Sequence, residues 1–400
     1  MPIKQQTFQD IFSNYVQTTP EIFKNKDVLS PDYVPEAIVH RDKQIRQLAS
    51  ILAPALRNLK VSNIFCFGKT GTGKTVCIKQ VTQDLQKRTD KIKIVYVNCK
   101  MKRVSDTEYR LLAEMCRSFG KKIPPTGLPS SEIYRIFYET LDEEKKNVII
   151  ILDEIDALVK KIGDDFLYHL TRINQDLASS KLSIIGISND ITFTENLDPR
   201  VKSSLSEEEI LFPPYNATQL QDILNQRTEQ GFNPGIVEPS VITKCAALAA
   251  QEHGDARKAL DLLRIAAEIA ERDNKLKVTL DHVEIAEEKK DLDRTVEIVK
   301  TQPKQSMAVL ASTIKLVENN KKNIQTGDIF ELYQQLCPNA GLKPLTQRRV
   351  SDLIGELDML GILSTKVISK GRYGRTREIR LHLSKPIMEK IKKVLNENYL

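Results

Sequence analysis

The stretch Gly68-Lys69-Thr70-Gly71-Thr72-Gly73-Lys74-Thr75 decides the fold class of this chain. It fits the pattern GxxxxGK[ST], whose glycines let the backbone wrap around phosphate groups with its amides pointing inward. An apolar run at residues 62–67 predicts a strand before it, and a helical pattern follows at residues 76–86. A chance glycine-rich turn would require neither neighbour. We therefore predict a phosphate-binding loop, in which Lys74 reaches the β- and γ-phosphates and the hydroxyl of Thr75 binds Mg²⁺.

Polar side chains follow two further strands that are predicted from apolar runs. Asp153 and Glu154 come directly after the run at residues 147–152, in the same predicted sheet as the phosphate-binding loop. Asp153 is the candidate for holding the metal from its other side, and Glu154 for orienting and polarising a water that attacks the γ-phosphate. The alternative for both carboxylates is a solvated strand end. Asn189 follows the run at residues 182–188, and it either hydrogen-bonds the γ-phosphate or the water, or is a turn residue.

Short apolar runs separated by helical patterns predict a buried parallel sheet with helices on both faces. The five runs are residues 62–67, 93–98, 147–152, 182–188 and 209–212. Beyond Tyr215 only helical patterns occur as far as residue 289, which predicts a small all-α domain, and residues 290–303 are predicted to be a connector. The last segment shows three helical patterns and then two strand-like runs, the order of a winged helix. We predict an α/β domain at residues 1–215, a helical domain at 216–295 and a winged-helix domain at 296–400.

The excess positive charge of the chain lies in its last quarter. The net charge is +7 over 400 residues, and residues 296–400 hold 18 Lys and Arg against 10 Asp and Glu. Such an asymmetry is typical of a polyanion-binding module attached to a nearly neutral body. The six cysteines form no CxxC pair, which fits reduced thiols and argues against a zinc site or a disulfide framework. The longest aliphatic run, residues 148–152, is too short to span a membrane and the first residues show no signal pattern, so we expect a cytoplasmic protein.

The C-terminal segment offers two basic elements to DNA. The third helical pattern carries Arg348 and Arg349 in its first turns, where a recognition helix contacts base edges, and either arginine can pair with a guanine. The predicted hairpin has a basic tip with glycines, whose backbone can approach phosphates or enter a minor groove. The tip residues are Lys370, Gly371, Arg372, Tyr373, Gly374 and Arg375. The alternatives are a solvated basic loop or a winged helix that binds protein.

Six motifs in this order resemble the AAA+ initiators of DNA replication in archaea, which are relatives of the largest subunit of the eukaryotic origin recognition complex and of its helicase-loading partner. The motifs are GKTGTGKT, IILDEID, ISND, LDPRVKSSL, FPPY and GDARKALDLL, and the resemblance covers nearly the whole chain from residue 35. It implies an AAA+ P-loop ATPase fold with strand order 5-1-4-3-2, a helical lid and a winged helix. It also implies ATP or ADP with Mg²⁺ as cofactors. The implied partners are double-stranded origin DNA, a replicative helicase of the MCM type and paralogous initiators.

The resemblance implies roles for particular residues. Asn189 matches sensor 1, and Arg257 matches sensor 2, the lid arginine that touches the nucleotide; the alternative for Arg257 is a solvated surface arginine. An insertion at residues 98–131 matches the element that touches DNA in the family, which makes Lys121 and Lys122 candidates. The residues implied to line the nucleotide site besides the phosphate-binding loop are Val39, His40, Arg41, Val76, Tyr215 and Arg227.

Arg200 lies where ring-forming relatives supply an arginine finger to the ATP of a neighbouring subunit. Ser203 and Ser204 stand where some relatives carry a second arginine. We expect either a finger or a structural pair between Arg200 and a carboxylate, Asp198 or Glu207. Without a finger, fast turnover is not expected, because a finger is worth several orders of magnitude in rate.

Together these patterns predict an ATP-controlled initiator of DNA replication that uses slow ATP hydrolysis as a switch. Recruitment of the helicase is implied by the resemblance alone. One alternative is a DNA-binding regulator that binds ATP with negligible turnover. Another is an AAA+ remodeller of protein substrates, which would need a central-pore aromatic loop and a robust finger, and the sequence shows neither.

Overall fold

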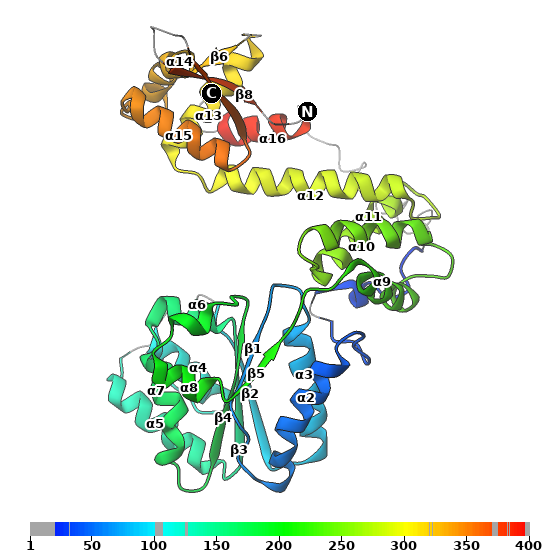
Figure 1. Cartoon of the computed structure of the whole chain (residues 1–400), viewed down its shortest axis with the longest axis vertical. Helices are drawn as coiled ribbons and strands as arrows, with labels where there is room; N and C mark the ends of the chain where they lie inside the picture. Colours follow the sequence, from blue (N-terminus) through cyan, green and yellow to red (C-terminus); the bar gives the residue numbers. More distant parts are fainter. Residues whose placement is uncertain are drawn as a thin grey trace, which may run out of the picture. The chain divides into compact units, whose positions relative to one another are not determined.

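The computed structural model describes residues 21–31, 33–100, 107–124, 127–319, 321, 323–369, 375–381, 383 and 385–396. These residues form two compact units, the first ending at Val283 and the second beginning at Glu284 (Figure 1). Within the described ranges, no helix is both long enough and apolar enough to cross a lipid bilayer.

A five-stranded parallel sheet forms the centre of the first unit. Its strands are β1 (Ile64–Phe67), β2 (Ile92–Asn98), β3 (Asn147–Asp153), β4 (Lys181–Ser188) and β5 (Glu208–Leu211). They lie in the order β2-β3-β4-β1-β5, which confirms the predicted fold class and strand order. Phe67 pairs with Ser188, and Asp153 pairs with Ile187. The carboxyl ends of β1, β3 and β4 therefore lie side by side at one edge of the sheet.

Helices cover both faces of this sheet (Figure 1). On one face, α2 (Asp42–Leu52) and α3 (Lys74–Arg88) pack over an apolar cluster that includes Ile78 and Ile149. The opposite face, where Ile150 points, is covered by α4 (Glu108–Ser118), α5 (Ser130–Glu143), α6 (Ile155–Ile162), α7 (Asp165–Arg172) and α8 (Pro199–Leu205). Because successive strand residues point to opposite faces, the Ile-rich run of β3 contributes to both clusters.

Three helices and the start of a fourth complete the first unit. They are α9 (Ala217–Gly231), α10 (Pro239–Gln251), α11 (Ala256–Arg272) and α12 (Leu280–Lys300). α9 starts at a capping box between Asn216 and Gln219. α11 starts at Asp255, whose side chain accepts the backbone amides of Arg257 and Lys258. This cap fixes where α11 begins and places Arg257 in its first turn.

The course of α12 shows that the prediction of a connector at residues 290–303 was wrong. The helix continues for 21 residues, from Leu280 to Lys300. Residues 284–300 contain neither glycine nor proline, so nothing in them interrupts a helix before Pro303. The many charges of this stretch suit an exposed helix as well as a linker, so composition alone did not separate the two.

The second unit contains the predicted winged-helix arrangement. Its elements are α13 (Lys304–Glu318), β6 (Ile324–Gln325), α14 (Thr326–Asn339), α15 (Gln347–Met359), β7 (Leu363–Ser369), β8 (Arg375–Leu381) and α16 (Lys385–Asn396). The three strands form an antiparallel sheet in the order β6-β8-β7. Helices α13, α14 and α15 share a core that includes Val309, Tyr333 and Ile354. The two-residue strand β6 and the helix α16 were not predicted.

Candidate functional site

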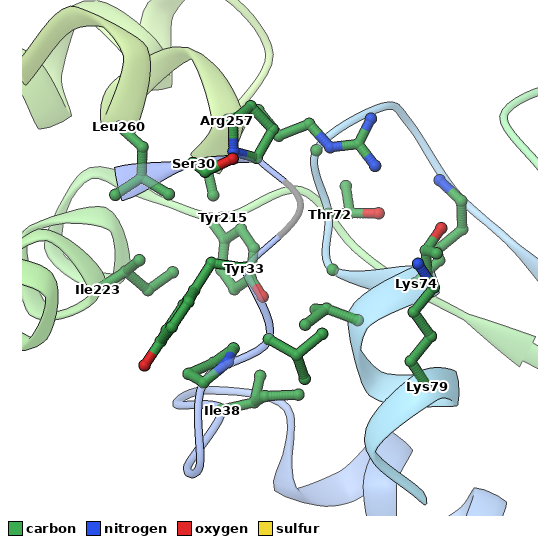
Figure 2. Close-up of a pocket in the computed structure, with 18 of the residues that line it drawn as sticks. Ser30, Tyr33, Ile38, Thr72, Lys74, Lys79, Tyr215, Ile223, Arg257 and Leu260 are labelled. Atoms are coloured by element: carbon green, nitrogen blue, oxygen red, sulfur yellow. The ribbon is translucent and has the colours of Figure 1, made fainter. Parts of the chain in front are cut away.

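A cavity of about 270 Å³ lies at the carboxyl edge of the parallel sheet (Figure 2). Its walls come from the segment before α2, the phosphate-binding loop with the start of α3, the ends of β2, β3 and β4, and helices α9 and α11. In Figure 2, Tyr33, Ile38 and Ile223 lie at one end of the cavity. At the other end, the side chain of Arg257 points toward the loop that leads into Lys74. The cavity therefore has an apolar end and a cationic end.

The phosphate-binding loop adopts a conformation that glycine permits. Gly71 has a φ of +73°, and a Cβ at this position would lie 1.7 Å from Oδ1 of Asp255. The ammonium of Lys74 folds back on the loop and donates to the carbonyls of Gly68 and Lys69, at 2.8 Å each. Gly71, Thr72 and Gly73 line the cavity, so the backbone of the loop can approach an anion there.

Lys74 is a buried cation, only 5% exposed. Burial lowers the pKa of Lys74 to about 8, while the nearby Asp153 raises it and Arg257 lowers it further. Lys74 and Arg257 both line the cavity and repel one another. An anionic ligand between the two cations would be attracted to both, and this attraction would offset their mutual repulsion.

Two oxygen-bearing side chains meet where β3 ends. The hydroxyl of Thr75 donates to Oδ2 of Asp153 at 2.9 Å, so the two residues predicted to hold a metal are adjacent. The hydroxyl of Tyr96 donates to the same oxygen at 2.5 Å. Tyr96 was not among the predicted site residues. The available signal was its place on β2, two residues before Asn98, which pairs with Asp153.

Glu154 turns the chain from β3 into α6. Its φ of 57° lies in the left-handed region, which residues other than glycine seldom adopt. Its Oε2 lies 3.3 Å from Nζ of Lys100, a neighbour that the sequence did not indicate. Glu154, Asp153 and Asn189 all line the cavity, so the three residues predicted at strand ends are brought together.

Arg41 packs against the phosphate-binding loop. It is 2% exposed, and its guanidinium donates to the carbonyls of Thr72 at 2.9 Å and Pro213 at 2.5 Å. The guanidinium also lies 3.7 Å from the centroid of the Tyr215 ring. Arg41 therefore ties the loop to the segment that leads into α9.

The other residues predicted to line the nucleotide site lie close to these. Val39, Val76 and Tyr215 line the cavity. His40 contacts α9 instead, with its Nε2 2.8 Å from Oδ2 of Asp222.

Arg227 on α9 is a buried cation with unpaired donors. It is 7% exposed, and among the described residues its Nε and Nη1 find no acceptor. Its guanidinium lies 4.7 Å from the centroid of the Tyr33 ring, and both residues line the cavity. Burial lowers the pKa of Arg227, and Tyr33 raises it. Because buried unpaired N–H groups cost free energy, they point to a ligand with acceptor atoms at the end of the cavity where Tyr33 lies.

The start of α11 touches the phosphate-binding loop directly, and the turn before it touches Tyr215. The amide of Ala256 donates to the carbonyl of Gly71 at 3.2 Å, and the amide of Tyr215 donates to the carbonyl of Gly254 at 3.3 Å. Gly254 has a φ of +69°, and a Cβ there would lie 2.2 Å from the carbonyl oxygen of Tyr215. These contacts hold Arg257, the next residue after Ala256, at the cationic end of the cavity.

Arg200 forms one of the two structural pairs that the sequence left open. Its guanidinium donates to both carboxylate oxygens of Asp198, at 3.0 and 2.9 Å, and lies 4.9 Å from the centroid of the Tyr168 ring. Hydrogen bonds from Arg200 lower the pKa of Asp198 to about 2. Glu207 accepts instead from the amide of Asn63 at 3.0 Å. The Arg200 side chain is 65% exposed, so the pair is screened by water and weak.

The two lysines of the insertion differ in their partners. Nζ of Lys121 lies 2.6 Å from Oε2 of Glu143. Lys122 is exposed, and among the described residues no carboxylate pairs with it. Lys122 is therefore the freer cation of the two.

The two arginines of α15 differ in the same way. The guanidinium of Arg349 lies 3.8 Å from Oδ2 of Asp352 and 3.6 Å from Oε1 of Glu356. Arg348 is exposed and has no such partner in the part of the chain that the structure describes. Of the predicted hairpin tip, Arg375 begins β8, while Lys370, Gly371, Arg372, Tyr373 and Gly374 lie outside the described residues.

Comparison with protein families defines the class of this chain. Family models match it as an AAA domain over residues 60–189, a Cdc6 AAA+ ATPase-type lid domain over residues 221–288 and a CDC6 C-terminal winged helix domain over residues 297–391. Fold and site together define an AAA+ protein with a lid and a winged helix of the Cdc6 type.

Whole proteins match as well. The chain is 53% identical to the ORC1-type DNA replication protein of Pyrococcus furiosus, over 95% of this chain and 91% of that protein. It is 51% identical to ORC1-type DNA replication protein 1 of Methanosarcina mazei, over 99% of this chain and 95% of that protein. The solved structure of the Aeropyrum pernix ORC1 protein in complex with DNA matches with a TM-score of 0.76 and 46% identity, over 94% of this chain and 97% of that one. The chain belongs to the archaeal ORC1/Cdc6 family of DNA replication initiators.

Proposed function

We propose that this chain is an ATP-binding initiator that recognises origin DNA and helps to recruit and load the replicative helicase, with slow ATP hydrolysis as its switch. Its protein partners in this proposal are an MCM-type helicase and paralogous initiators. The proposal rests on the family, on the Aeropyrum pernix relative whose structure is a complex with DNA, and on the two-ended cavity. We keep residues 1–215, 216–295 and 296–400 as the proposed domains.

The two-ended cavity is the observation that carries the nucleotide part of the proposal. At its cationic end, Lys74 and Arg257 would bind the β- and γ-phosphates together with the backbone amides of the loop. At its apolar end, Tyr33 and Ile223 would contact the base. Arg227 would donate from its unpaired N–H groups to acceptor atoms of the base or the sugar.

The residues at the end of β3 fit Mg²⁺ and a hydrolytic step. The hydroxyl of Thr75 and the carboxylate of Asp153 lie 2.9 Å apart, and hard oxygen ligands of this kind suit Mg²⁺. When bound, Mg²⁺ neutralises charge on the phosphate oxygens. Glu154 would accept a proton from a water whose oxygen bonds to the γ-phosphorus as the bond from that phosphorus to ADP breaks. Asn189 would orient the same water or the γ-phosphate.

The DNA part of the proposal uses free cations on two elements. Arg348 in the first turn of α15 would contact base edges, because its guanidinium is exposed and unpaired among the described residues. Lys122 in the insertion would contact phosphates for the same reason. The hairpin tip at residues 370–375 would add backbone or minor-groove contacts.

The experiment that tests the nucleotide part is ATP binding and hydrolysis by the full chain and two variants. Lys74→Ala should lose most of its ATP affinity, because it removes the cation that faces the β- and γ-phosphates. Glu154→Gln should bind ATP as the wild type does and release no phosphate. Hydrolysis by Glu154→Gln at the wild-type rate would refute the general-base role of Glu154.

A second candidate function is a DNA-binding regulator that binds ATP with negligible turnover. Two contacts within the chain favour it, because Glu154 lies beside Lys100 and Arg200 is paired with Asp198. Each group that would speed hydrolysis must therefore first leave an ion pair, although both pairs are screened by water and weak. Single-turnover hydrolysis with and without DNA separates the two functions, since only a switch requires phosphate release on the time scale of DNA binding.

A further inference from the structure

Tyr96 contacts Asp153, although Tyr96 itself belongs neither to the phosphate-binding loop nor to the carboxylates at the strand ends. It lies on β2, and its hydroxyl donates to Oδ2 of Asp153 at 2.5 Å. The same oxygen accepts the hydroxyl of Thr75 at 2.9 Å, while Oδ1 accepts the amide of Glu154 at 3.0 Å. Three donors from β2, α3 and the β3–α6 turn therefore fix one carboxylate.

The ring of Tyr96 is itself held in place from α3. Nζ of Lys79 lies 4.7 Å from the ring centroid, and both side chains line the cavity. Tyr96 is 37% exposed, so it does not belong to the hydrophobic core, where a buried hydroxyl would need some partner. A phenol keeps its proton at neutral pH and can only donate to a carboxylate. The hydroxyl therefore always acts as the donor in this hydrogen bond, and it holds the oxygen of Asp153 in place.

We propose that Tyr96 is the positioning residue for the divalent-cation site, because its hydroxyl fixes the orientation of the Asp153 carboxylate beside the hydroxyl of Thr75. This inference rests on the nucleotide site proposed above and adds a residue to it. Of the three donors to Asp153, Thr75 is itself a proposed ligand and Glu154 contributes only its backbone. Among the described residues that donate to Asp153, Tyr96 is therefore the side chain left to orient this ligand. Groups that orient metal ligands typically change metal affinity ~10–100-fold when they are removed.

Tyr96→Phe is the variant that isolates this role. It keeps the ring against Lys79 and removes only the hydroxyl that Asp153 accepts. Tyr134→Phe is a matched control, since Tyr134 also donates to a carboxylate, that of Glu108, and neither of these residues lines the cavity. Both substitutions therefore remove one hydrogen bond from tyrosine to carboxylate, and only one of them does so at the proposed cation site.

The test measures the affinity of the full chain for a fluorescent AMP-PNP, first in EDTA and then along a series of free Mg²⁺ concentrations. We expect Tyr96→Phe to match the wild type in EDTA. The Mg²⁺ concentration that gives half of the affinity gain should rise about tenfold. Tyr134→Phe should leave both quantities unchanged. In an Asp153→Ala background, adding Tyr96→Phe should have no further effect, because the side-chain oxygen that the hydroxyl orients is gone.

Two results with Tyr96→Phe would refute the positioning role, and one result with the wild type would refute the nucleotide function as well. If Tyr96→Phe has the wild-type Mg²⁺ dependence, the positioning role is refuted and the hydroxyl serves folding alone, which a lowered melting temperature would show. If Tyr96→Phe weakens AMP-PNP binding equally in EDTA and in Mg²⁺, Tyr96 contacts the nucleotide and the inference is also refuted. Absence of AMP-PNP binding by the wild type would refute the proposed nucleotide function itself, and this inference with it.

Discussion

Nζ of Lys100 lies 3.3 Å from Oε2 of Glu154, which pairs a lysine at the start of the insertion with the proposed general base. The Lys100 side chain is 73% exposed, so the pair contributes ~1 kcal/mol or less. A carboxylate held beside a lysine is less free to contact a water. The insertion and the hydrolytic residues are therefore in direct contact within the first unit.

Replacing Lys100 tests whether this ion pair restrains hydrolysis. Lys100→Met should raise the single-turnover rate of ATP hydrolysis up to about fivefold, which corresponds to ~1 kcal/mol in the barrier. The rise should disappear when Glu154→Gln is added, because the base is then missing. A rate unchanged in Lys100→Met would show that the pair does not restrain Glu154.

The lowered pKa of Lys74 predicts a pH dependence of nucleotide affinity. The pKa of Lys74 is about 8 because the side chain is buried, and a bound polyphosphate would raise that pKa by its charge. Above this pH, binding takes up a proton, so the affinity for AMP-PNP should fall as pH rises, by up to about tenfold per unit. Below it, Lys74 is protonated in both states and contributes no slope. Calorimetry between pH 7 and pH 9.5, roughly the range that brackets this pKa, measures the effect.

A control variant assigns this slope to Lys74. Lys74→Arg keeps a positive charge throughout the same range, because arginine does not deprotonate there. Its affinity should be lower than that of the wild type and should show no slope above neutral pH. A slope of wild-type size in Lys74→Arg would mean that another group takes up the proton.

The unpaired donors of Arg227 predict that the two ends of the cavity can be separated. Arg227→Met should weaken ATP binding about tenfold or more, since hydrogen bonds from a charged donor are worth ~1.5–3 kcal/mol. It should leave the affinity for tripolyphosphate unchanged, because that ligand has no base or sugar. Lys74→Ala should weaken the binding of both ligands. Equal losses for ATP and tripolyphosphate in Arg227→Met would place Arg227 at the phosphates instead.

The different partners of Arg348 and Arg349 predict different effects on DNA recognition. If the side chain contacts a base, Arg348→Ala should narrow the gap in binding free energy between origin and random DNA by ~1–3 kcal/mol. Arg349→Ala should change the gap less, because its guanidinium is engaged by Asp352 and Glu356. Binding titrations on both DNAs at one stated salt concentration measure the two gaps. The reverse order would exclude Arg348 as the residue that contacts bases.

The insertion should act on affinity without acting on specificity. Lys122→Ala should weaken binding to all DNA and reduce the slope of log affinity against log salt by about one unit, as expected for one lost phosphate contact. Lys121→Ala should have a smaller effect, because Lys121 is paired with Glu143. Equal salt slopes for wild type and Lys122→Ala would remove Lys122 from the DNA surface.

Much of the fold could be predicted because its signals are local. The glycine pattern ending in Lys74, the apolar run before Asp153 and the helix–hairpin order of the C-terminal segment each lie in contiguous residues. The end of α12 could not be predicted from composition, because a charged stretch without glycine or proline suits a helix and a linker alike.

The contacts that refine the site could not be predicted, because they join residues far apart in the chain. The place of Tyr96 on a strand does not by itself indicate that its hydroxyl reaches Asp153, and nothing near Arg227 indicates that it lies over Tyr33. The same holds for the pairing of Lys121 with Glu143, which depends on how α5 packs beside the end of α4.

The most direct test of the initiator function is footprinting of the full chain on its own chromosomal DNA at base resolution and one stated salt concentration. An initiator with a winged helix of this kind should protect a repeated sequence beside an AT-rich tract, and Arg348→Ala should lose that protection before it loses binding to random DNA. Protection that is scattered over promoters, or that shows no preferred sequence, would contradict origin recognition.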